Sequence, residues 1–410
     1  MSHPGTLTGR EAPNQPSRDT RRTLAVAGLA HAFHDGLTSS IYLLMPLWQV
    51  RFGLDYGALA MLRALYVGAL AGLQIPSGWL GRRMGTRAVL GIGTLLSGGA
   101  FALSGISGGL LGLGATLVLA GVGGSTQHPL ASAAVSRAYG GAARGPLGLY
   151  NFAGDLGKAT LPPVLALAMG PQGWHPAFWA IAGLGAGVAL LILWLMPRSG
   201  SHQVNAAAPA VAIARAPDHG RRGRGFGLLV AIAMLDGAAG VGLLLFLPAL
   251  MQAKGGTPAT LGLALSLLFV GGACGKAVCG WLGSRLGLLA TVIVTEIGTA
   301  AAIMALLALP FLPALVLLPA LGIMLNGTSS VLYGTVPELA PASRIEHAFA
   351  LFYSCTLGSS ALAPVLYGWL GDAAGPRWAV MLAGATSLAV VPLMILLAPQ
   401  LAPYRPAARA

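Results

Sequence analysis

Ionisable side chains interrupt several long apolar runs of this 410-residue sequence, and their spacing points to acid–base chemistry. His31, His34 and Asp35 lie in one such run, and His31 precedes Asp35 by four residues. Residues at i and i+4 share a helix face, so a helix would set the His31 imidazole beside the Asp35 carboxylate. An imidazole beside a carboxylate can change protonation near neutral pH. We therefore predict that these three residues couple the activity of the protein to protons.

Two other interpretations of this group stay open. A hydrogen bond between histidine and aspartate would serve helix packing alone, and two histidines with one aspartate would suit a metal ion. The sequence offers no further ligand, so we assign no metal and no other cofactor. Asp236 is followed by glycine, as Asp35 is, and we include it in the proton-coupling prediction. A contact between Asp236 and another helix is the alternative.

A second charged group lies farther along the chain, where Asp155 and Lys158 are three residues apart in an apolar run. Charges within a membrane are usually paired or face a wet cavity. We predict that this pair takes part in substrate binding or gating, with a static ion pair as the alternative. Lys276 is expected to extend its ammonium group to the membrane surface, and Glu296 is expected to face a neighbouring helix.

Other polar residues in the apolar runs are candidates for substrate contact. Arg63 could contact Asp35 or an anionic substrate, or its guanidinium could extend to the outer membrane surface. His128 precedes Pro129, which predicts a kink in the helix, and its imidazole could line a cavity. The remaining candidates, for which contacts between helices are the alternative, are Tyr150, Asn151, Asn326 and Tyr353.

The elements that must position these residues are membrane-spanning helices. Hydrophobic residues make up 55% of the chain and charged residues 9%, whereas soluble globular proteins carry about 25% charged residues. This composition excludes an ordinary soluble enzyme, a DNA-binding domain and a disordered scaffold. A helix needs about 20 apolar residues to cross a bilayer. The apolar runs predict twelve spans: 24–50, 57–79, 88–106, 109–136, 146–170, 175–196, 226–252, 258–282, 287–309, 312–338, 345–371 and 376–399.

The basic residues predict the orientation of these spans. Eighteen arginines fall on one side of the membrane, and three basic residues, Arg51, Lys254 and Arg377, fall on the other. Because positively charged loops stay in the cytoplasm, both termini are expected inside. The predicted parts are a cytoplasmic tail (1–21), a six-helix bundle (22–196), a cytoplasmic linker (197–224), a second six-helix bundle (225–400) and a second cytoplasmic tail (401–410).

The two halves of the chain repeat one another at an offset of 201–202 residues. Asp35 corresponds to Asp236, and residues 78–85 correspond to residues 280–287. We therefore predict an all-α membrane protein of two six-helix bundles related by pseudo-two-fold symmetry. A cavity between two such bundles can open to either side when one bundle rocks against the other. Asp155 and Lys158 have no charged counterparts in the second half, which favours a functional role for them.

These features resemble the major facilitator superfamily over nearly the whole chain. The loop from Gly78 to Gly85 is similar to the signature of that family between helices 2 and 3. Arg82 stands where the family usually has aspartate, and the basic position that follows is kept as Arg83 and, in the second copy, Arg285. The resemblance implies the fold of that family and a cytoplasmic gate formed by these loops.

A narrower likeness concerns the fosmidomycin-resistance type of drug exporter. That type typically has histidine and then Asn-Asp in its first span, where this chain has His31, His34 and Asp35. It typically has Gly-Asn in its fifth span, where this chain has Gly154 and Asp155. The likeness implies export of a small molecule in exchange for protons.

Together these observations predict a secondary active transporter in a bacterial inner membrane. It would move a small polar or anionic organic molecule by alternating access, with proton-coupled export as the expected direction. Proton-coupled or facilitated uptake of a nutrient or metal chelate is the first alternative, and a membrane-embedded enzyme or receptor is the second.

The partners and the source of energy follow from the same sequence. It contains no Gly-x-x-x-x-Gly-Lys-Ser/Thr loop and no hydrolase motif, so we expect an ion gradient rather than ATP to supply the energy, and no enzymatic activity. The basic residues form no continuous stripe, so nucleic acid is not expected as a partner. The expected partners are the substrate, protons and the lipid bilayer, and the protein is expected to be a monomer.

Overall fold

The fold was examined in a computed structural model, which describes residues 17–169, 174–197, 219–340 and 345–401. Within these ranges the chain is helical and contains no strand. The first half forms α1 (Arg18–Phe52), α2 (Tyr56–Gly72), α3 (Gln74–Met84), α4 (Thr86–Ser104), α5 (Leu110–Gly124), α6 (Gln127–Tyr139), α7 (Arg144–Ala168) and α8 (His175–Leu195). The second half forms α9 (His219–Ala253), α10 (Pro258–Ala308), α11 (Phe311–Leu339), α12 (Ile345–Ala374) and α13 (Pro376–Leu397).

The predicted spans correspond to these helices, with three differences in how they are divided. The second span is bent by 45° between α2 and α3. The fourth span is divided between α5 and α6, whereas the eighth and ninth form the single 51-residue helix α10, which is kinked at Gly287. Helix α9 begins at His219, inside the predicted linker, and most of that linker lies outside the described residues.

Seven helical segments of the described chain are long and apolar enough to cross a membrane, or eight if the bent pair α2 and α3 counts as one span. Helix α10 counts once in this number although it contains two of the predicted spans. Helices α1, α7 and α12 are long enough but do not meet the same test of apolar character. These are the helices that carry His31, Asp35, Asp155, Lys158 and Tyr353. Polarity is therefore concentrated in particular helices of the fold.

Local sequence fixes where the helices start and bend. The Ser17 hydroxyl accepts a hydrogen bond from the Thr20 backbone N–H at the start of α1, and Thr257 forms a capping box at the start of α10. Both devices satisfy backbone donors that the first helical turn leaves unpaired. Gly85 and Gly287 have φ angles of 89° and 80°. Glycine adopts such positive φ angles without steric cost, so the sequence repeat is also a repeat in backbone geometry.

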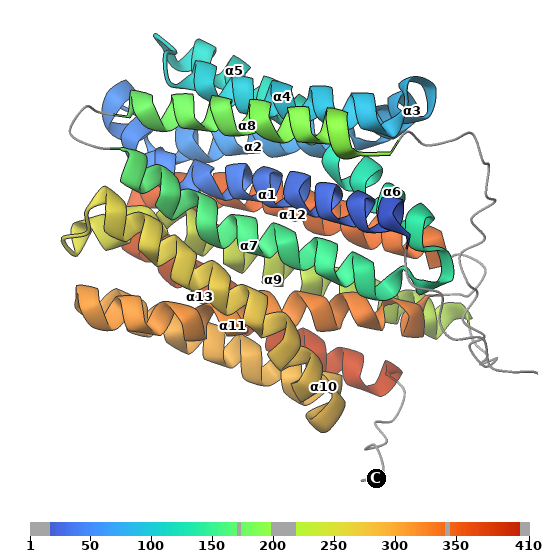
Figure 1. The fold of residues 1–410 in the computed structure, drawn as a ribbon. Coiled ribbons are helices and arrows are strands. Elements are labelled where there is room, and N and C mark those ends of the chain that lie inside the picture. Colours follow the sequence, from blue (N-terminus) through green and yellow to red (C-terminus); the bar gives the residue numbers. More distant parts are fainter. Residues whose placement is uncertain (1–16, 170–173, 198–218, 341–344, 402–410) are drawn as a thin grey trace, which may run out of the picture.

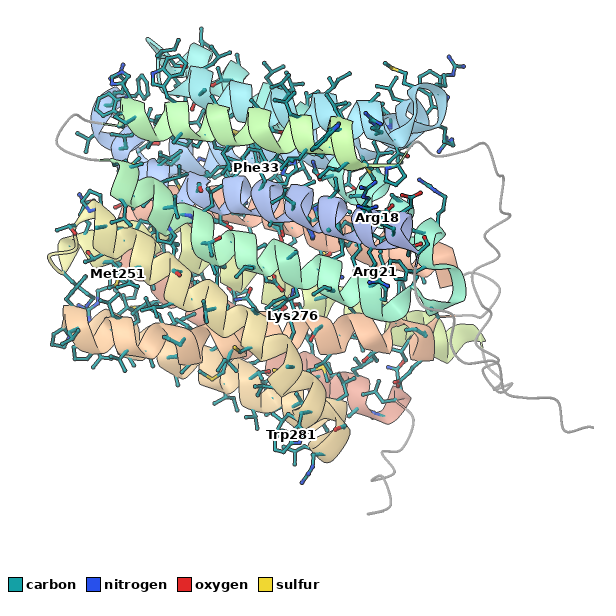
Figure 2. All side chains as sticks on the ribbon, in the orientation of Figure 1. Arg18, Arg21, Phe33, Met251, Lys276 and Trp281 are labelled. Atoms are coloured by element: carbon teal, nitrogen blue, oxygen red, sulfur yellow. The ribbon has the colours of Figure 1, made fainter. Side chains whose placement is uncertain are left out.

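The two bundles pack through a small set of helices. Helices α1, α7, α9 and α12 run through the middle of the molecule in Figure 1, between α4 and α8 on one side and α10 and α11 on the other. The bundles meet where α2 packs against α12 and where α7 packs against α10. We call the end that carries Arg18, Arg21 and helix α3 the arginine-rich end, and the end of α9 near Met251 the opposite end (Figure 1 and Figure 2).

Candidate functional site

A cavity of about 790 Å³ lies between the two bundles. It is lined by one helix of the first bundle, α7, and by four of the second, α9, α10, α11 and α12. The polar lining residues are Asn151, Asp155, Lys276, Ser329, Ser330, Tyr333, Tyr353, Thr356 and Ser360. These positions lie in the middle of their helices or toward the arginine-rich end.

At the opposite end the two bundles are held together by direct contacts. The Asp372 carboxylate on α12 accepts hydrogen bonds of 2.8 Å from the backbone N–H groups of Tyr56 and Gly57, at the start of α2. Nearer the middle of the molecule, the Arg63 guanidinium on α2 donates to the carbonyl of Ser360 on α12, a residue that also lines the cavity, at 2.7 Å. Arg63 is 6% exposed, so the expectation that its side chain extends to the membrane surface is wrong. No contact between Arg63 and Asp35 is present among the described residues.

Four charged residues of α1, α7 and α10 form one continuous chain of ion pairs. Lys276 Nζ lies 2.5 Å from Asp155 Oδ2, across the boundary between the bundles. Lys158 Nζ lies 3.4 Å from Asp155 Oδ1 and 3.0 Å from Asp35 Oδ2. Two lysines and two carboxylates therefore alternate, and their formal charges sum to zero.

Close packing of α1 against α7 brings these groups together. A Cβ atom on Gly157 would lie 1.8 Å from the Ala32 carbonyl oxygen, so only glycine permits this approach of the two backbones. One turn earlier, a Cβ atom on Gly154 would lie 2.7 Å from His31 Cε1 and 2.8 Å from Asp35 Oδ2. The two glycines thus make the space in which the predicted acid–base pair meets Lys158.

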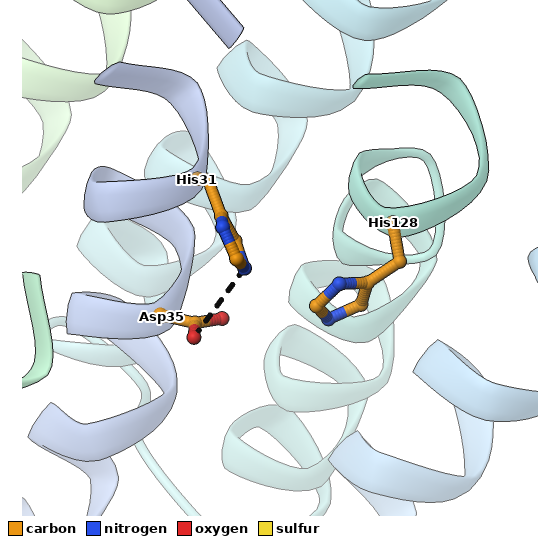
Figure 3. A group of neighbouring side chains, drawn as sticks. All are labelled: His31, Asp35 and His128. Atoms are coloured by element: carbon orange, nitrogen blue, oxygen red, sulfur yellow. Dashed lines mark ion pairs between the residues drawn. The ribbon is translucent and has the colours of Figure 1, made fainter. Parts of the chain in front are cut away.

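His31 is held in a defined orientation beside Asp35. Its ring stacks on Tyr150 at a centroid distance of 4.1 Å, and its Nδ1 atom lies 2.9 Å from the Tyr150 carbonyl oxygen. A carbonyl only accepts, so Nδ1 carries the hydrogen and Nε2 of the neutral ring has a free lone pair. Nε2 lies 3.5 Å from Asp35 Oδ2 (Figure 3) and makes no hydrogen bond within the described chain. A proton that arrives here would be shared by the imidazole and the carboxylate.

The same geometry bears on the metal interpretation. One ligand atom each from His31, Asp35 and His128 lies within 4.8 Å of the others, so His128 takes the place that the sequence gave to His34 (Figure 3). The orientation of His31 suits a metal ligand. However, the ammonium group of Lys158, 3.0 Å from Asp35, would repel a second cation. The charges around Asp35 therefore favour a proton over a metal ion.

The other candidates of the first bundle lie in different surroundings. The His34 ring packs against Gly124 on α5, where a Cβ atom would come within 2.6 Å of its Cε1 atom. The helix break of the fourth span falls at Ser125 and Thr126, just before the predicted kink at His128. The His128 ring lies edge-on to His31 at 5.2 Å.

The remaining predicted polar residues divide between the cavity and helix contacts. Asn151 and Tyr353 line the cavity. Tyr150 is buried behind it, where its ring stacks on His31. Asn326 packs against Gly272 on α10, so its side chain serves a contact between helices.

Asp236 lies inside the second bundle. It is 6% exposed, and its carboxyl group hydrogen-bonds to that of Glu296, which is 2% exposed. The Ser387 hydroxyl on α13 also donates to Glu296, which therefore faces a neighbouring helix as predicted. No basic side chain pairs with either acid among the described residues. Two neighbouring carboxylates repel each other, which makes an acid pair of this kind a candidate site for a shared proton.

The predicted gate loops have matching local structure in the two bundles. Arg83 stacks over the Trp79 ring at 4.0 Å, and Arg285 stacks over the Trp281 ring at 5.1 Å. Arg82 is exposed, and no carboxylate pairs with any of these arginines in the described part of the chain. Gly78 is uncrowded, and Gly85 provides the positive φ angle noted above.

Lys276 is the main site residue that the sequence did not identify. Its ammonium group pairs with Asp155 and does not extend to the membrane surface. A sequence signal existed, because the chain has only three lysines, Lys158, Lys254 and Lys276, and its predicted membrane surfaces carry arginine except at Lys254. The two lysines within apolar runs are the two that join the ion-pair chain.

Comparisons with known proteins agree with this architecture. A family model described as Major Facilitator Superfamily matches residues 27–215 and 226–410. A probable sulfoacetate transporter of Cupriavidus necator is 29% identical over 147 residues, 36% of this chain and 34% of that protein. A probable L-galactonate transporter of Escherichia coli is 31% identical over 143 residues, 35% of this chain and 30% of that protein. The matched part spans about a third of the length of these relatives.

Solved structures with the same fold include two of a bacterial homologue of the human lysosomal transporter Spinster. The inward-facing, occupied form has a TM-score of 0.74 at 13% identity, and it covers 95% of this chain and 100% of the other. The inward-facing, unoccupied form has a TM-score of 0.75 at 14% identity with the same coverage. At this level of identity the match concerns the fold alone.

Proposed function

The chain belongs to the Major Facilitator Superfamily, and on that premise we propose that it carries a small organic anion through the central cavity, coupled to the movement of protons. That it is a multi-pass membrane transporter of small organic molecules, and not an enzyme, follows from the family and the relatives. The anion, the coupling to protons and the inner membrane with cytoplasmic termini belong to the proposal.

The ion-pair chain from Lys276 to Asp35 is the observation that carries this proposal. Lys276, at one end of the ion-pair chain, lines the cavity, where a substrate would bind. The other end is a carboxylate beside an imidazole with a free lone pair, where a proton would bind. Both relatives are named for organic acids, sulfoacetate and L-galactonate, which supports an anionic substrate.

The contacts between the bundles differ between the two ends of the molecule, as alternating access requires. The Asp372 carboxylate latches the bundles at the opposite end, Arg63 joins α2 to α12 beside the cavity, and the cavity itself lies toward the arginine-rich end. We propose that this arrangement corresponds to a state that communicates with the cytoplasm. Rocking of one bundle against the other would break the latch and close the arginine-rich end.

The direction of transport has two candidates. Export in exchange for protons is the direction that the resemblance to drug exporters implies. Transport of the anion together with a proton is favoured by a specific observation, because Lys158 is shared between Asp35 and Asp155 and so links the proton site to the substrate site.

Flux measurements in liposomes test the proposal. We expect wild-type protein to move labelled sulfoacetate or L-galactonate when a pH gradient is imposed, and the polarity of the effective gradient distinguishes exchange from co-transport. Asp35→Asn should lose gradient-driven flux but keep exchange of labelled for unlabelled substrate, because exchange needs no net proton movement. Asp19→Asn, an exposed aspartate on the same helix, is the matched control and should behave as wild type. Unchanged gradient-driven flux in Asp35→Asn would refute the assignment.

A further inference from the structure

We infer that an organic anion and a proton bind cooperatively, the anion at Lys276 and the proton between Asp35 and His31, and that Lys158 links the two sites. This inference rests on the proposed function, because it treats the central cavity as the substrate site. It adds an anion subsite at Lys276, which would determine specificity for charged substrates. It also adds the sign of the linkage between substrate binding and proton binding.

Lys276 has the features of an anion subsite. Its side chain is 41% exposed although it lies in the middle of the molecule, because it faces the cavity. It is the only basic side chain among the described residues that line this cavity, and Asp155 is the only acidic one. The Tyr353 hydroxyl lines the same space and could donate a hydrogen bond to a carboxylate or sulfonate, whereas the Ser329 hydroxyl donates to the Asn326 carbonyl. A substrate anion at Lys276 would take the place that the Asp155 carboxylate now holds.

Displacement of Asp155 has a consequence at Asp35. Once Lys276 pairs with a substrate anion, the remaining cation within reach of Asp155 is Lys158, 3.4 Å away. A full pair between Lys158 and Asp155 withdraws the ammonium group from Asp35. A carboxylate in a desolvated site that loses its cation partner binds a proton more readily. The free lone pair of His31 Nε2 faces the same position and completes the proton site.

The charge balance of the site gives the same result. The four charges of Asp35, Lys158, Asp155 and Lys276 sum to zero before any substrate binds. An anion alone would leave one negative charge in the interior, which is costly in a membrane. An anion together with one proton restores neutrality, so each ligand is expected to favour the other.

The other titratable groups near Asp35 come from α1, α2, α6, α7 and α12. They are His31 and His34 of α1, Tyr66 of α2, His128 of α6, Tyr150 and Lys158 of α7, and Tyr353 of α12. Lys158 is the only one of them that also contacts the residue facing the anion subsite. The link between the two sites therefore depends on this lysine.

The sign of this linkage decides between the two directions. Positive linkage means that the loaded carrier holds both ligands, which is co-transport, whereas exchange requires that substrate and proton expel one another. Linkage is reciprocal, so the anion must bind more tightly at lower pH. For the usual range of coupling between sites, the affinity should rise roughly 5- to 150-fold when the proton site is filled.

Calorimetry on the purified full-length protein measures the linkage directly. L-Galactonate and sulfoacetate serve as probe anions, and L-galactose serves as the uncharged counterpart. Repeating the titration in buffers of different ionisation enthalpy should give an uptake of about one proton per anion bound. Lys158→Met should bind the anion without proton uptake, whereas L-galactose should bind at least tenfold more weakly than L-galactonate. Anion binding without proton uptake, or with proton release, would overturn the inference.

A second measurement needs no identified substrate. Lys276→Met frees Asp155 as an anion would, so Asp35 should gain a proton, seen as an added protonated-carboxyl band in the infrared spectrum. The band should disappear in Lys276→Met/Asp35→Asn, and Lys276→Arg, which keeps the charge, should match wild type. An unchanged band in Lys276→Met would overturn the linkage even if gradient-driven flux is present. Absence of gradient-driven flux alone would refute the proposed function instead.

Discussion

Asp35 and Asp236 occupy corresponding positions in the two bundles but have opposite surroundings. Asp35 lies beside a lysine, a histidine and the ion-pair chain that reaches the cavity. Asp236 contacts a second acid, Glu296, to which the Ser387 hydroxyl donates a hydrogen bond. The same fold position therefore supports two kinds of chemistry, because the neighbouring helices supply different partners.

The difference suggests a division of labour between the bundles. In the first bundle a cation can move between two carboxylates, so the charge of the site responds to what binds in the cavity. In the second bundle the acid pair is buried without a basic partner among the described residues, and the Ser387 hydroxyl donates to Glu296. We expect the first bundle to link proton binding to substrate binding, and the second bundle to line the cavity without changing its own protonation. The sequence-based prediction that Asp236 also couples to protons is tested below.

Removal of Lys158 should have the largest effect on stability, because it takes away the cation that distinguishes the surroundings of Asp35 from those of Asp236. Lys158→Met leaves Asp35 without its cation in a desolvated site, and loss of one partner of such a pair costs about 3 kcal/mol of unfolding free energy. Unfolding in mixed micelles at increasing SDS concentration measures the effect. Lys158→Met/Asp35→Asn should regain most of the stability, because it removes the carboxyl group that lost its cation partner. A Lys158→Met protein as stable as wild type would mean that Asp35 does not depend on this lysine.

A pair of glycines tests whether close helix packing is needed in only one bundle. A Cβ atom on Gly157 would meet the Ala32 backbone, whereas Gly358, its repeat partner, has no atom within 4 Å of that position. Gly157→Ala should cost about 1–3 kcal/mol and separate Asp35 from Lys158. Gly358→Ala should stabilise its helix by about 0.5–1 kcal/mol, because glycine is a poor helix former. Equal effects of the two substitutions on stability and flux would show that the packing of α1 against α7 is not special.

The sequence predicted the fold well because the relevant signals are local or repeated. Apolar run lengths marked the spans, and arginine placement kept their order consistent. The spacing of His31 and Asp35 gave their contact correctly because it depends on one helix alone. The positive φ angles of Gly85 and Gly287 follow from the repeated loop motif in the same way.

Contacts between the bundles could not be predicted in this way. Lys276 and Asp155 are 121 residues apart, and the pair exists only because α7 and α10 cross at one depth. Arg63 was expected near Asp35 or at the surface, and it instead contacts the Ser360 carbonyl on α12. The contact of Asp236 with Glu296 could not be predicted either, because the two residues lie on different helices, α9 and α10. Local spacing defines pairs within a helix, whereas the crossing of helices defines pairs between them.

Weakening the latch between the bundles should have a smaller effect on stability. Two aspartates at the start of α2 allow helix capping to be tested separately from the contact between bundles. Asp55 caps α2 from its own bundle by accepting from the Ala58 N–H at 2.7 Å, whereas Asp372 caps the same helix from the other bundle. Asp55→Asn and Asp372→Asn should each cost about 1 kcal/mol or less. Only Asp372→Asn should raise the labelling rate of a cysteine introduced near Tyr56, since it alone loosens the contact between bundles. Equal labelling in the two variants would contradict a latch.

The smallest effect is expected in the second bundle. Asp236→Asn/Glu296→Gln keeps the shape of the acid pair and replaces the contact between its carboxyl groups with an amide hydrogen bond, so stability should stay within about 1 kcal/mol of wild type. If the second bundle only lines the cavity, gradient-driven flux and proton uptake on anion binding should also remain, in contrast to Asp35→Asn. If proton uptake falls in the double variant while anion binding persists, Asp236 shares in the coupling and the division between the bundles is wrong. The comparison is sharp because both variants change the aspartate at the corresponding position of the repeat to asparagine, and Glu296→Gln leaves the new asparagine a partner that can hydrogen-bond, so a difference in outcome reports on the neighbours of the residue and not on its place in the fold.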